Sequence, residues 1–248
     1  INKFREIHTE AARFYFANLL RTKNPGYEYL RKRGLSDKII KKFGLGYSPN
    51  SWNSLMNYLL SKGYDKTDLV KCGLITHKTE SNKYFDRFRN RVMFPIFNYN
   101  GKVIGFGGRV LDDSLPKYLN SPETLVFNKR MNLYGLNISK KGIKDDTLIL
   151  VEGYMDLISL YQNNIENVVA TLGTALTIEQ AKLIRRFAKN VIISYDSDQA
   201  GQNATLRAID ILLQADIKVK ILNLKDCKDP DDFIKKYGFD GYKKAIEE

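Results

Sequence analysis

Residues 147–224 alternate between apolar runs typical of buried strands and segments with helical spacing, and this alternation constrains the fold more than any other feature of the chain. The strand-like runs are residues 147–151, 168–171, 191–195 and 217–224. The helical segments between them are residues 155–163, 178–188 and 200–215. Strands that alternate with helices predict a parallel sheet covered by helices on both faces. We therefore predict an α/β fold for this part of the chain.

The first part of the chain follows a different pattern, in which short helices precede a hairpin. Helical spacing occurs in residues 1–20, 27–43, 52–60 and 65–72. Gly34 divides the second of these segments, and Ser36 is the predicted N-cap after it. Apolar runs on both sides of Asn100 and Gly101 predict a β-hairpin. We expect an α+β subdomain at residues 1–142, followed by the parallel-sheet α/β subdomain at residues 143–248.

Charge is distributed unevenly between the two parts. Residues 1–145 contain 27 Lys and Arg against 12 Asp and Glu, whereas residues 146–248 contain 13 against 16. A basic surface favours a polyanion such as nucleic acid, although a lysine-rich solubilising surface gives the same count. No run approaches the ~18 apolar residues of a membrane span, and Cys72 and Cys227 have no partner at ligand spacing. We expect no membrane partner, no zinc and a cytoplasmic location.

Acidic residues cluster at and beyond three predicted strand ends, at the edge where the carboxyl ends of parallel strands meet. They are Glu152, Asp156, Asp196, Asp198, Asp229, Asp231 and Asp232. The spacing of Asp196 and Asp198 directs both carboxylates to the same side of an extended backbone. Clustered carboxylates repel one another, and divalent cations such as Mg²⁺ remove that cost. Each acid alone is more commonly a helix cap, so the prediction of a metal site depends on the combination.

The stretches that carry the first acids resemble a TOPRIM domain, the metal-binding fold shared by topoisomerases and primases. They are LVEGYMD at 150–156, TLGTALT at 171–177 and SYDSDQAG at 194–201. The resemblance implies that Glu152, Asp196 and Asp198 are the central acids of the site. It also implies supporting metal ligands at Asp156, Asp229 and Asp231, and leaves Asp232 as a solvent or capping residue.

Five stretches of the basic first part resemble signatures of bacterial DnaG-type primases. They are LRKRGLS at 30–36, FRNRVMFPI at 88–96, GKVIGFGGRV at 101–110, PKYLNSPET at 116–124 and FNKRMNLYGL at 127–136. The resemblance extends from about Phe14 to Tyr237. It implies a core that synthesises short RNA primers on single-stranded DNA from ribonucleoside triphosphates. It further implies nucleotidyl transfer assisted by two or more Mg²⁺ or Mn²⁺ ions.

The resemblance also implies roles for basic and polar residues of the first part. The matching positions are Arg33, Arg109, Lys117, Asn120 and Lys129. All five are expected to handle nucleotide and template. Lys117 and Lys129 are assigned to the catalytic groove beside the acids, and Arg33 and Arg109 to phosphate binding. Glu152 is either a base or an orienting metal ligand, and both alternatives stay open.

Two further patterns have alternative interpretations. Gly105, Gly107 and Gly108 allow the backbone to approach a phosphate or nucleic-acid strand closely. Arg87, Arg89 and Arg91 alternate along an extended segment, and they form either one basic face or a charged edge strand that discourages aggregation.

Three aromatic residues, Tyr118, Phe127 and Tyr134, lie among the basic positions. Aromatic faces can stack bases, but we favour the interpretation that these three rings belong to the core.

The resemblance also sets expectations about partners. Primases of this type usually begin with a zinc-binding domain and end with a helical domain that docks on a DnaB-type helicase; the chain shows no Cys/His cluster and stops at Glu248. We therefore expect poorly specific initiation from this chain, action at the replication fork, and inhibition by guanosine alarmones at the triphosphate site. A TOPRIM topoisomerase or nuclease and a nonenzymatic single-stranded DNA binder are the alternatives. Metal-dependent ribonucleotide incorporation on a single-stranded template distinguishes the three.

Overall fold

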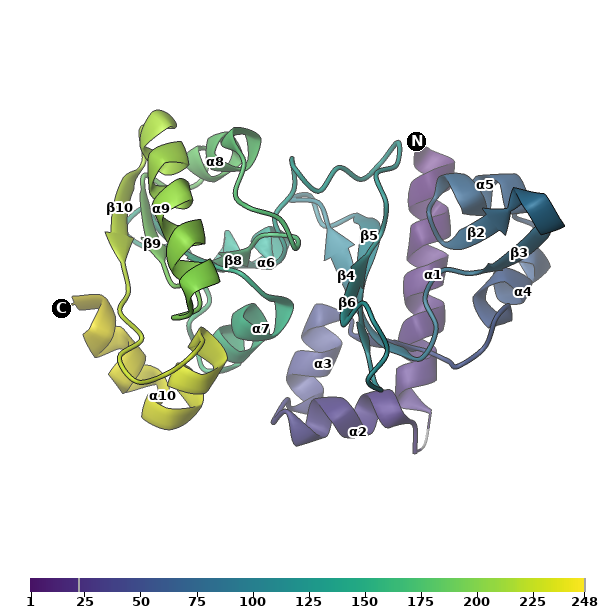
Figure 1. The fold of residues 1–248 in the computed structure, drawn as a ribbon, viewed down its shortest axis with the longest axis horizontal. Helices are drawn as coiled ribbons and strands as arrows, with labels where there is room; N and C mark the ends of the chain where they lie inside the picture. Colours follow the sequence, from purple (N-terminus) through teal and green to yellow (C-terminus); the bar gives the residue numbers. More distant parts are fainter. Residues whose placement is uncertain (22, 248) are drawn as a thin grey trace. The chain divides into compact units, whose positions relative to one another are not determined.

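The structure, a computed structural model, describes residues 1–21 and 23–247 and divides the chain into two compact units (Figure 1). The first unit comprises residues 1–97 and 102–128, and the second comprises residues 98–101 and the chain from residue 129 onward. Residues 129–142, which the sequence pattern placed in the first subdomain, pack with the second unit. Gln180 Nε2 donates to the carbonyls of Lys129 (2.9 Å) and Asn132 (2.8 Å), and Tyr134 pairs with Ala170 at the end of a strand.

The first unit combines short helices with a four-stranded antiparallel sheet in the order β1-β4-β5-β6. Its helices are α1 (Asn2–Leu20), α2 (Pro25–Lys32), α3 (Asp37–Phe43), α4 (Ser54–Ser61) and α5 (Lys66–Lys71). The sheet strands are β1 (Gly46–Ser48), β4 (Arg91–Phe97), β5 (Val103–Val110) and β6 (Tyr118–Asn120). A separate hairpin consists of β2 (Ile75–Lys78) and β3 (Lys83–Asp86), joined by a short 3-10 turn.

Local chemistry explains several of these boundaries. The Ser36 side chain accepts a hydrogen bond from the Ile39 amide (3.3 Å), which confirms the predicted cap of α3. The predicted β4–β5 hairpin is also confirmed, with Gly101 at φ +79° in its turn. Helix α1 packs against β1 and β5 through a stripe of buried residues at helical spacing, among them Ile7, Ala11 and Tyr15.

The second unit contains a four-stranded sheet in the order β10-β9-β7-β8 in which every pairing is parallel. Its strands are β7 (Thr147–Val151), β8 (Val168–Ala170), β9 (Asn190–Ile193) and β10 (Lys218–Ile221). Its helices are α6 (Leu136–Ser139), α7 (Tyr154–Gln162), α8 (Ile178–Arg185), α9 (Gln199–Gln214) and α10 (Pro230–Glu247). The predicted parallel-sheet α/β fold is therefore confirmed.

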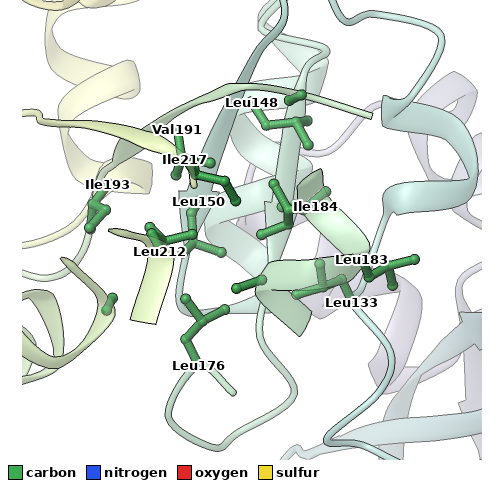
Figure 2. Close-up of a cluster of buried hydrophobic side chains, with 14 of the residues drawn as sticks. Leu133, Leu148, Leu150, Leu176, Leu183, Ile184, Val191, Ile193, Leu212 and Ile217 are labelled. Carbon is green, nitrogen blue, oxygen red and sulfur yellow. The ribbon is translucent and has the colours of Figure 1, made fainter. Parts of the chain in front are cut away.

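The core of the second unit explains why its strands read as apolar runs. Leu148 and Leu150 of β7 and Val191 and Ile193 of β9 point into one cluster (Figure 2). Helices α8 and α9 complete this cluster, which includes Leu212. Both faces of these strands are buried, as expected for a parallel sheet covered by helices. Among the described residues, no helix is both long and apolar enough to cross a membrane.

Candidate active site

The predicted acids of the second unit gather at the carboxyl edge of its parallel sheet. Glu152 follows β7 directly, and Asp156 lies in the first turn of α7. Asp196 and Asp198 lie between β9 and α9, whereas Asp229 and Asp231 lie on either side of the start of α10. Parallel topology brings these segments together, because all four strands end at the same edge.

Hydrogen bonds tie the ends of β7 and β9 to each other. The Asp196 amide donates to Glu152 Oε1 (3.2 Å), so the Glu152 side chain holds the backbone of Asp196. Asp198 Oδ1 accepts from the Gly201 amide (2.7 Å) and caps α9, which is the capping role that single acids commonly have. A side chain at Gly201 would lie 2.1 Å from the Asp196 carbonyl oxygen, so this close approach requires glycine. The loop that carries both aspartates is thereby held in one conformation.

A second set of bonds ties α7 to the start of α10. The Asp231 amide donates to Asp156 Oδ1 (3.3 Å). Asp231 is buried and pairs through Oδ2 with Lys235 (2.7 Å) one helical turn later. Asp229 Oδ1 accepts from the Asp232 amide (2.8 Å), so Asp229 caps α10. These contacts fix the backbone around both aspartates.

Burial and mutual repulsion dominate the electrostatics of this edge. Burial raises the pKa of Asp156 to about 8, with further contributions from Asp196 and Asp229. Burial also raises the pKa of Asp196 to about 7, and Glu152 is the next largest cause. The pKa of Glu152 is raised by burial and by Asp198, against the bond from the Asp196 amide. These three carboxyl groups therefore hold protons more tightly than ordinary acids do.

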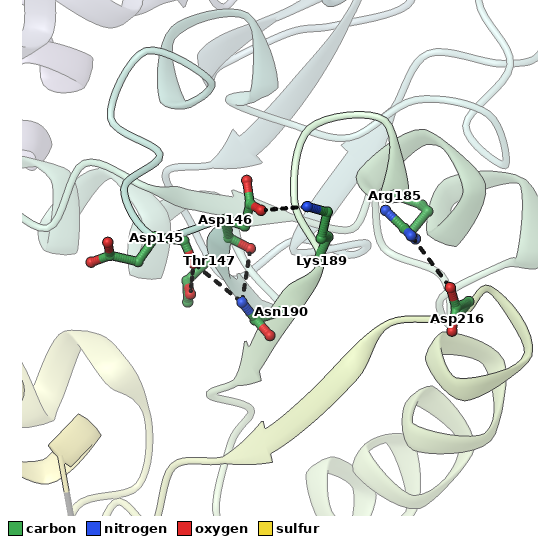
Figure 3. A network of polar contacts seen from close by, with 7 residues as sticks. All are labelled: Asp145, Asp146, Thr147, Arg185, Lys189, Asn190 and Asp216. Atoms are coloured by element: carbon green, nitrogen blue, oxygen red, sulfur yellow. Dashed lines mark hydrogen bonds and ion pairs between the residues drawn. The ribbon is translucent and has the colours of Figure 1, made fainter.

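The opposite edge of the same sheet balances its charges (Figure 3). Asp146, before β7, pairs with Lys189 (3.0 Å), and Asp216, before β10, pairs with Arg185 (3.3 Å). Asn190 Nδ2 reaches the Asp145 and Asp146 carbonyls at 3.2 and 3.4 Å. Asp146 and Asp216 at the amino edge thus have cationic partners, whereas Asp156 and Asp196 at the carboxyl edge are repelled by other acids.

The carboxyl edge fits hard divalent cations by its donor chemistry. Asp196 Oδ1 is a buried acceptor with no hydrogen-bond partner, as expected for an atom that awaits a cation. In residues 1–21 and 23–247, no three His, Cys, Asp or Glu side chains are arranged to hold one ion together. Mg²⁺ commonly binds through one or two carboxylates and keeps several waters, so it needs no preformed cage.

In the first unit, two of the predicted phosphate binders meet on one tyrosine. Arg33 donates to the Tyr29 hydroxyl (2.8 Å), and the Arg109 guanidinium lies 4.4 Å from the centre of the Tyr29 ring. All three side chains are half-buried. Stacking holds the Arg109 fork in place and preserves its ability to bind phosphate oxygens. Tyr29 contacts both arginines, and the sequence interpretation missed it because its contact with Arg109 joins α2 to β5.

The remaining predicted basic and polar residues are divided between the units. Lys117 is exposed immediately before β6, whose first residue, Tyr118, pairs with Arg109 of β5. Asn120 ends the same strand and is half-buried. Lys129 is half-buried in the second unit, in the segment that precedes α6. The first unit therefore contains Arg33, Arg109, Lys117 and Asn120, and the second contains Lys129 with the acids.

Two of the glycines expected to approach a phosphate have a different environment. A side chain at Gly108 would lie 2.9 Å from Phe88 and 3.0 Å from Arg91, and one at Gly105 would lie 3.2 Å from Phe127. The space beside these two residues is thus filled by side chains of the first unit itself. Both glycines allow close packing within the sheet, and the phosphate interpretation is wrong for them.

The alternating arginines form neither a basic face nor an edge strand. Arg91 is buried in β4, an inner strand, and donates to the carbonyls of Gly108 (3.0 Å), Pro116 (2.9 Å) and Lys117 (3.3 Å). Arg87 and Arg89 lie in the loop before β4, where Arg87 donates to the Asn120 carbonyl (3.0 Å). Arg87 and Arg91 therefore stabilise the β6 region through its backbone carbonyls.

Arg89 contributes to an aromatic platform that the sequence interpretation missed. Its guanidinium lies 4.0 Å from the centre of the Trp52 ring, and the Phe85 ring meets Trp52 edge-on at 5.6 Å. Trp52 is 63% exposed although tryptophan is mostly buried in proteins. Of the three aromatic residues weighed earlier, Phe127 and Tyr134 are core residues, as favoured, whereas Tyr118 is 37% exposed.

Comparisons with known proteins cover almost the whole chain. Residues 14–140 match the DNA primase catalytic core, N-terminal domain, and residues 149–234 match the Toprim-like family. The DNA primase of Clostridium acetobutylicum is 52% identical over 246 residues, which are 99% of this chain and 41% of the relative. The DNA primase of Deinococcus radiodurans is 46% identical over 210 residues, 84% of this chain and 37% of the relative. The chain thus spans about two fifths of the length of these relatives.

Solved structures agree with this result. A DNA primase domain from Pseudomonas aeruginosa superposes with a TM-score of 0.92 at 39% identity, covering 99% of this chain and 78% of that one. The Aquifex aeolicus primase, with zinc-binding and RNA polymerase domains, gives 0.92 at 40% identity, covering 99% and 60%. A DnaG primase catalytic domain bound to single-stranded DNA gives 0.90 at 35% identity, covering 99% and 81%.

Proposed function

This chain belongs to the family of DnaG-type DNA primase catalytic cores, and on that premise we propose that it synthesises short RNA primers on single-stranded DNA. The observation that carries the proposal is the carboxyl edge of the second unit. There, Glu152, Asp156 and Asp196 have raised pKa values, and Asp196 keeps a buried oxygen without a donor. Such an arrangement destabilises the metal-free protein and favours bound divalent cations.

The proposed reaction is nucleotidyl transfer. The 3′-hydroxyl oxygen of the primer forms a bond to the α-phosphorus of a ribonucleoside triphosphate, and the bond to the pyrophosphate oxygen breaks. The hydroxyl proton passes to a base, for which Glu152 is a candidate. Bound Mg²⁺ or Mn²⁺ ions would lower the hydroxyl pKa and stabilise charge on the leaving oxygens. We assign Glu152, Asp196 and Asp198 to hold these ions, supported by Asp156, Asp229 and Asp231.

Glu152 has two candidate roles in this scheme. Its raised pKa makes it a better proton acceptor than an ordinary glutamate, which suits a general base. Its bond to the Asp196 amide equally suits an orienting ligand that keeps the β9 loop in place. A Glu152→Gln variant keeps the acceptor for that amide but removes both the base and the anionic charge. A lost rate at unchanged Mn²⁺ affinity would indicate the base, and a loss of both would indicate the metal ligand.

The basic residues are proposed to hold substrate and template. We assign Lys117 and Lys129 to the triphosphate, and Arg33, Arg109 and Asn120 to phosphates of nucleotide or template. Arginine forks match phosphate oxygens in pairs, whereas lysine acts as a point charge. The exposed Trp52 with its stacked arginine supports template binding, because base stacking tolerates any sequence.

Other partners stay predictions from the family resemblance. They are a DnaB-type helicase at the replication fork in the cytoplasm, and guanosine alarmones. An alarmone carries phosphates on both sides of its ribose, so it would compete with the substrate triphosphate. Lys117→Ala should then weaken substrate and inhibitor together, and noncompetitive inhibition would exclude a shared site.

The direct test is ribonucleotide incorporation by this chain on a single-stranded DNA template. We expect primers to form with Mg²⁺ or Mn²⁺ and to disappear when EDTA is added. Nicking or relaxation of DNA without incorporation would instead identify a TOPRIM nuclease or topoisomerase. Binding of the template without any metal-dependent chemistry would leave only a DNA-binding role and would overturn the proposal.

A further inference from the structure

The connection between β10 and α10 places one lysine directly beside the acidic edge. Lys228 precedes Asp229, and its carbonyl accepts hydrogen bonds from the Ser197 amide (2.8 Å) and the Ser197 hydroxyl (3.2 Å). Ser197 lies between Asp196 and Asp198, so these two bonds hold the backbone of Lys228 against the loop that carries both acids. The exposed lysine side chain starts from this fixed position.

The charge of Lys228 is unusual in this environment. The charged groups that raise the pKa of Asp196 are Glu152, Asp229 and Asp198, and Lys228 opposes them by lowering it. The main charged groups that act on Asp156 and Glu152 are again acids. Another nearby cation, Lys235, is engaged by Asp231 on α10. Lys228 is thus a cation whose charge acts on Asp196 and whose backbone is bonded to the loop of the central acids.

We propose that Lys228 is the resident counter-cation of the acidic edge. While no divalent ion is bound, its ammonium offsets part of the negative charge of the central acids. The same ammonium repels an arriving divalent cation, so Lys228 sets the concentration at which the site fills. This inference depends on the metal site of the proposed function and adds a residue that tunes its affinity.

Electrostatics gives the direction of the effect at two stages. Removing the ammonium leaves the acids without their cation, so the metal-free protein should become less stable. It also removes the repulsion of the ion, and a unit charge roughly 8 Å from a doubly charged ion in a water-like medium changes affinity about fivefold. Metal-free stability and metal affinity should therefore change in opposite directions, which a merely structural role for Lys228 would not produce.

The test is a titration of this chain with Mn²⁺ at low salt and pH 8.5. The electron paramagnetic resonance signal of the free ion measures how much Mn²⁺ is bound. Five proteins are compared: wild type, Lys228→Gln, Lys228→Arg, Lys218→Gln and Asp196→Asn, which lacks one of the proposed metal ligands. Lys218 is the first residue of β10 and pairs with Asn190 at the amino edge of the sheet. Its variant therefore removes the same charge at the edge opposite the acids. We expect Lys228→Gln to bind Mn²⁺ about fivefold more tightly, and Lys228→Arg and Lys218→Gln to match wild type within twofold.

Several outcomes would overturn the inference. Equal affinity of Lys228→Gln and wild type would show that Lys228 has no such role, while leaving the metal site intact. Equal tightening by Lys218→Gln would show a general charge effect. Wild type that binds no better than Asp196→Asn would remove the metal site itself and the counter-cation with it. Thermal unfolding without metal gives the second readout, in which Lys228→Gln should melt below wild type until Mn²⁺ is added.

Discussion

The two units use charged side chains in opposite ways. In the first unit, Arg91 and Arg87 donate to backbone carbonyls, and Arg89 and Arg109 stack on aromatic rings. In the second unit, Glu152, Asp156 and Asp196 of the carboxyl edge are repelled by neighbouring acids and have raised pKa values. The basic excess of the first part therefore overstates the charge that is available to a ligand. A candidate site is better located by charges that lack partners than by net charge.

The largest expected effect concerns Arg91, which tests whether its charge is structural. Arg91→Met keeps the apolar stem but leaves the carbonyls of Gly108, Pro116 and Lys117 without their donor. We expect the free energy of unfolding to fall by about 3 kcal/mol. Urea denaturation measures it, and the exposed Arg13→Met variant is the control, with a change below about 0.5 kcal/mol. An unchanged free energy of unfolding for Arg91→Met would mean that the charge of Arg91 is not structural and is available to a ligand.

A slightly smaller effect concerns pH and the second unit. Asp156 and Asp196 titrate near 8 and 7 in the folded protein but near ~3.9 when unfolded. Because these pKa values are higher in the folded protein, the protonated groups contribute their full stability below the unfolded pKa. This contribution is lost as pH rises through about 7 to 8. Asp156→Asn removes this dependence at one position and keeps the acceptor for the Asp231 amide.

The difference in the free energy of unfolding between Asp156→Asn and wild type should therefore grow, in favour of the variant, as pH rises from 5 to 9. We expect a gain of about 2 kcal/mol, which is discounted from the full pKa shift because Asp156 is partly exposed. Denaturation at three pH values measures the difference, and millimolar Mg²⁺ should reduce it. A difference that stays constant with pH would mean that the carboxylates of this edge do not destabilise the folded protein when they ionise. The two units would then not differ in how they use charged side chains.

Trp52 tests whether exposed groups of the first unit, rather than its buried arginines, hold the template. Trp52→Ala should weaken single-stranded DNA binding by about 1 to 2 kcal/mol, the usual contribution of one base stack. Fluorescence anisotropy with a labelled oligonucleotide measures it. Trp52→Phe keeps an aromatic face and should retain most of the affinity. If both variants bind like wild type, the platform has no part in template binding.

The smallest expected effect is on salt dependence. Lys117→Gln should reduce the slope of log affinity against log salt by about 0.7, the value for one phosphate contact on a single strand. Its effect on stability should be negligible, because Lys117 is exposed. Lys218→Gln removes the same charge in the second unit and should leave the slope unchanged. Equal changes in both variants would mean that net charge alone drives binding.

Much of the second unit was predictable, because its signals are local. Apolar runs predicted β7 to β10, and parallel topology alone implied that Glu152, Asp196 and Asp229 would meet at one edge. Contacts distant in sequence were not predictable in this way. The burial of Arg91 depends on carbonyls contributed by β5 and by the residues just before β6, and the packing of Gly108 depends on Phe88. Neither partner is evident from the residues next to these positions.

Because the acids lie in the second unit and the exposed basic and aromatic groups in the first, we expect single substitutions to separate catalysis from template binding. The most direct measurement is therefore ribonucleotide incorporation and single-stranded DNA affinity on one preparation of Asp196→Asn. Asp210→Asn, an exposed acid on α9, is the matched control. We expect Asp196→Asn to bind the template within about twofold of wild type and to lose at least about 100-fold in incorporation rate. Incorporation by Asp196→Asn at the rate of Asp210→Asn would contradict the assignment of catalysis to the acidic edge.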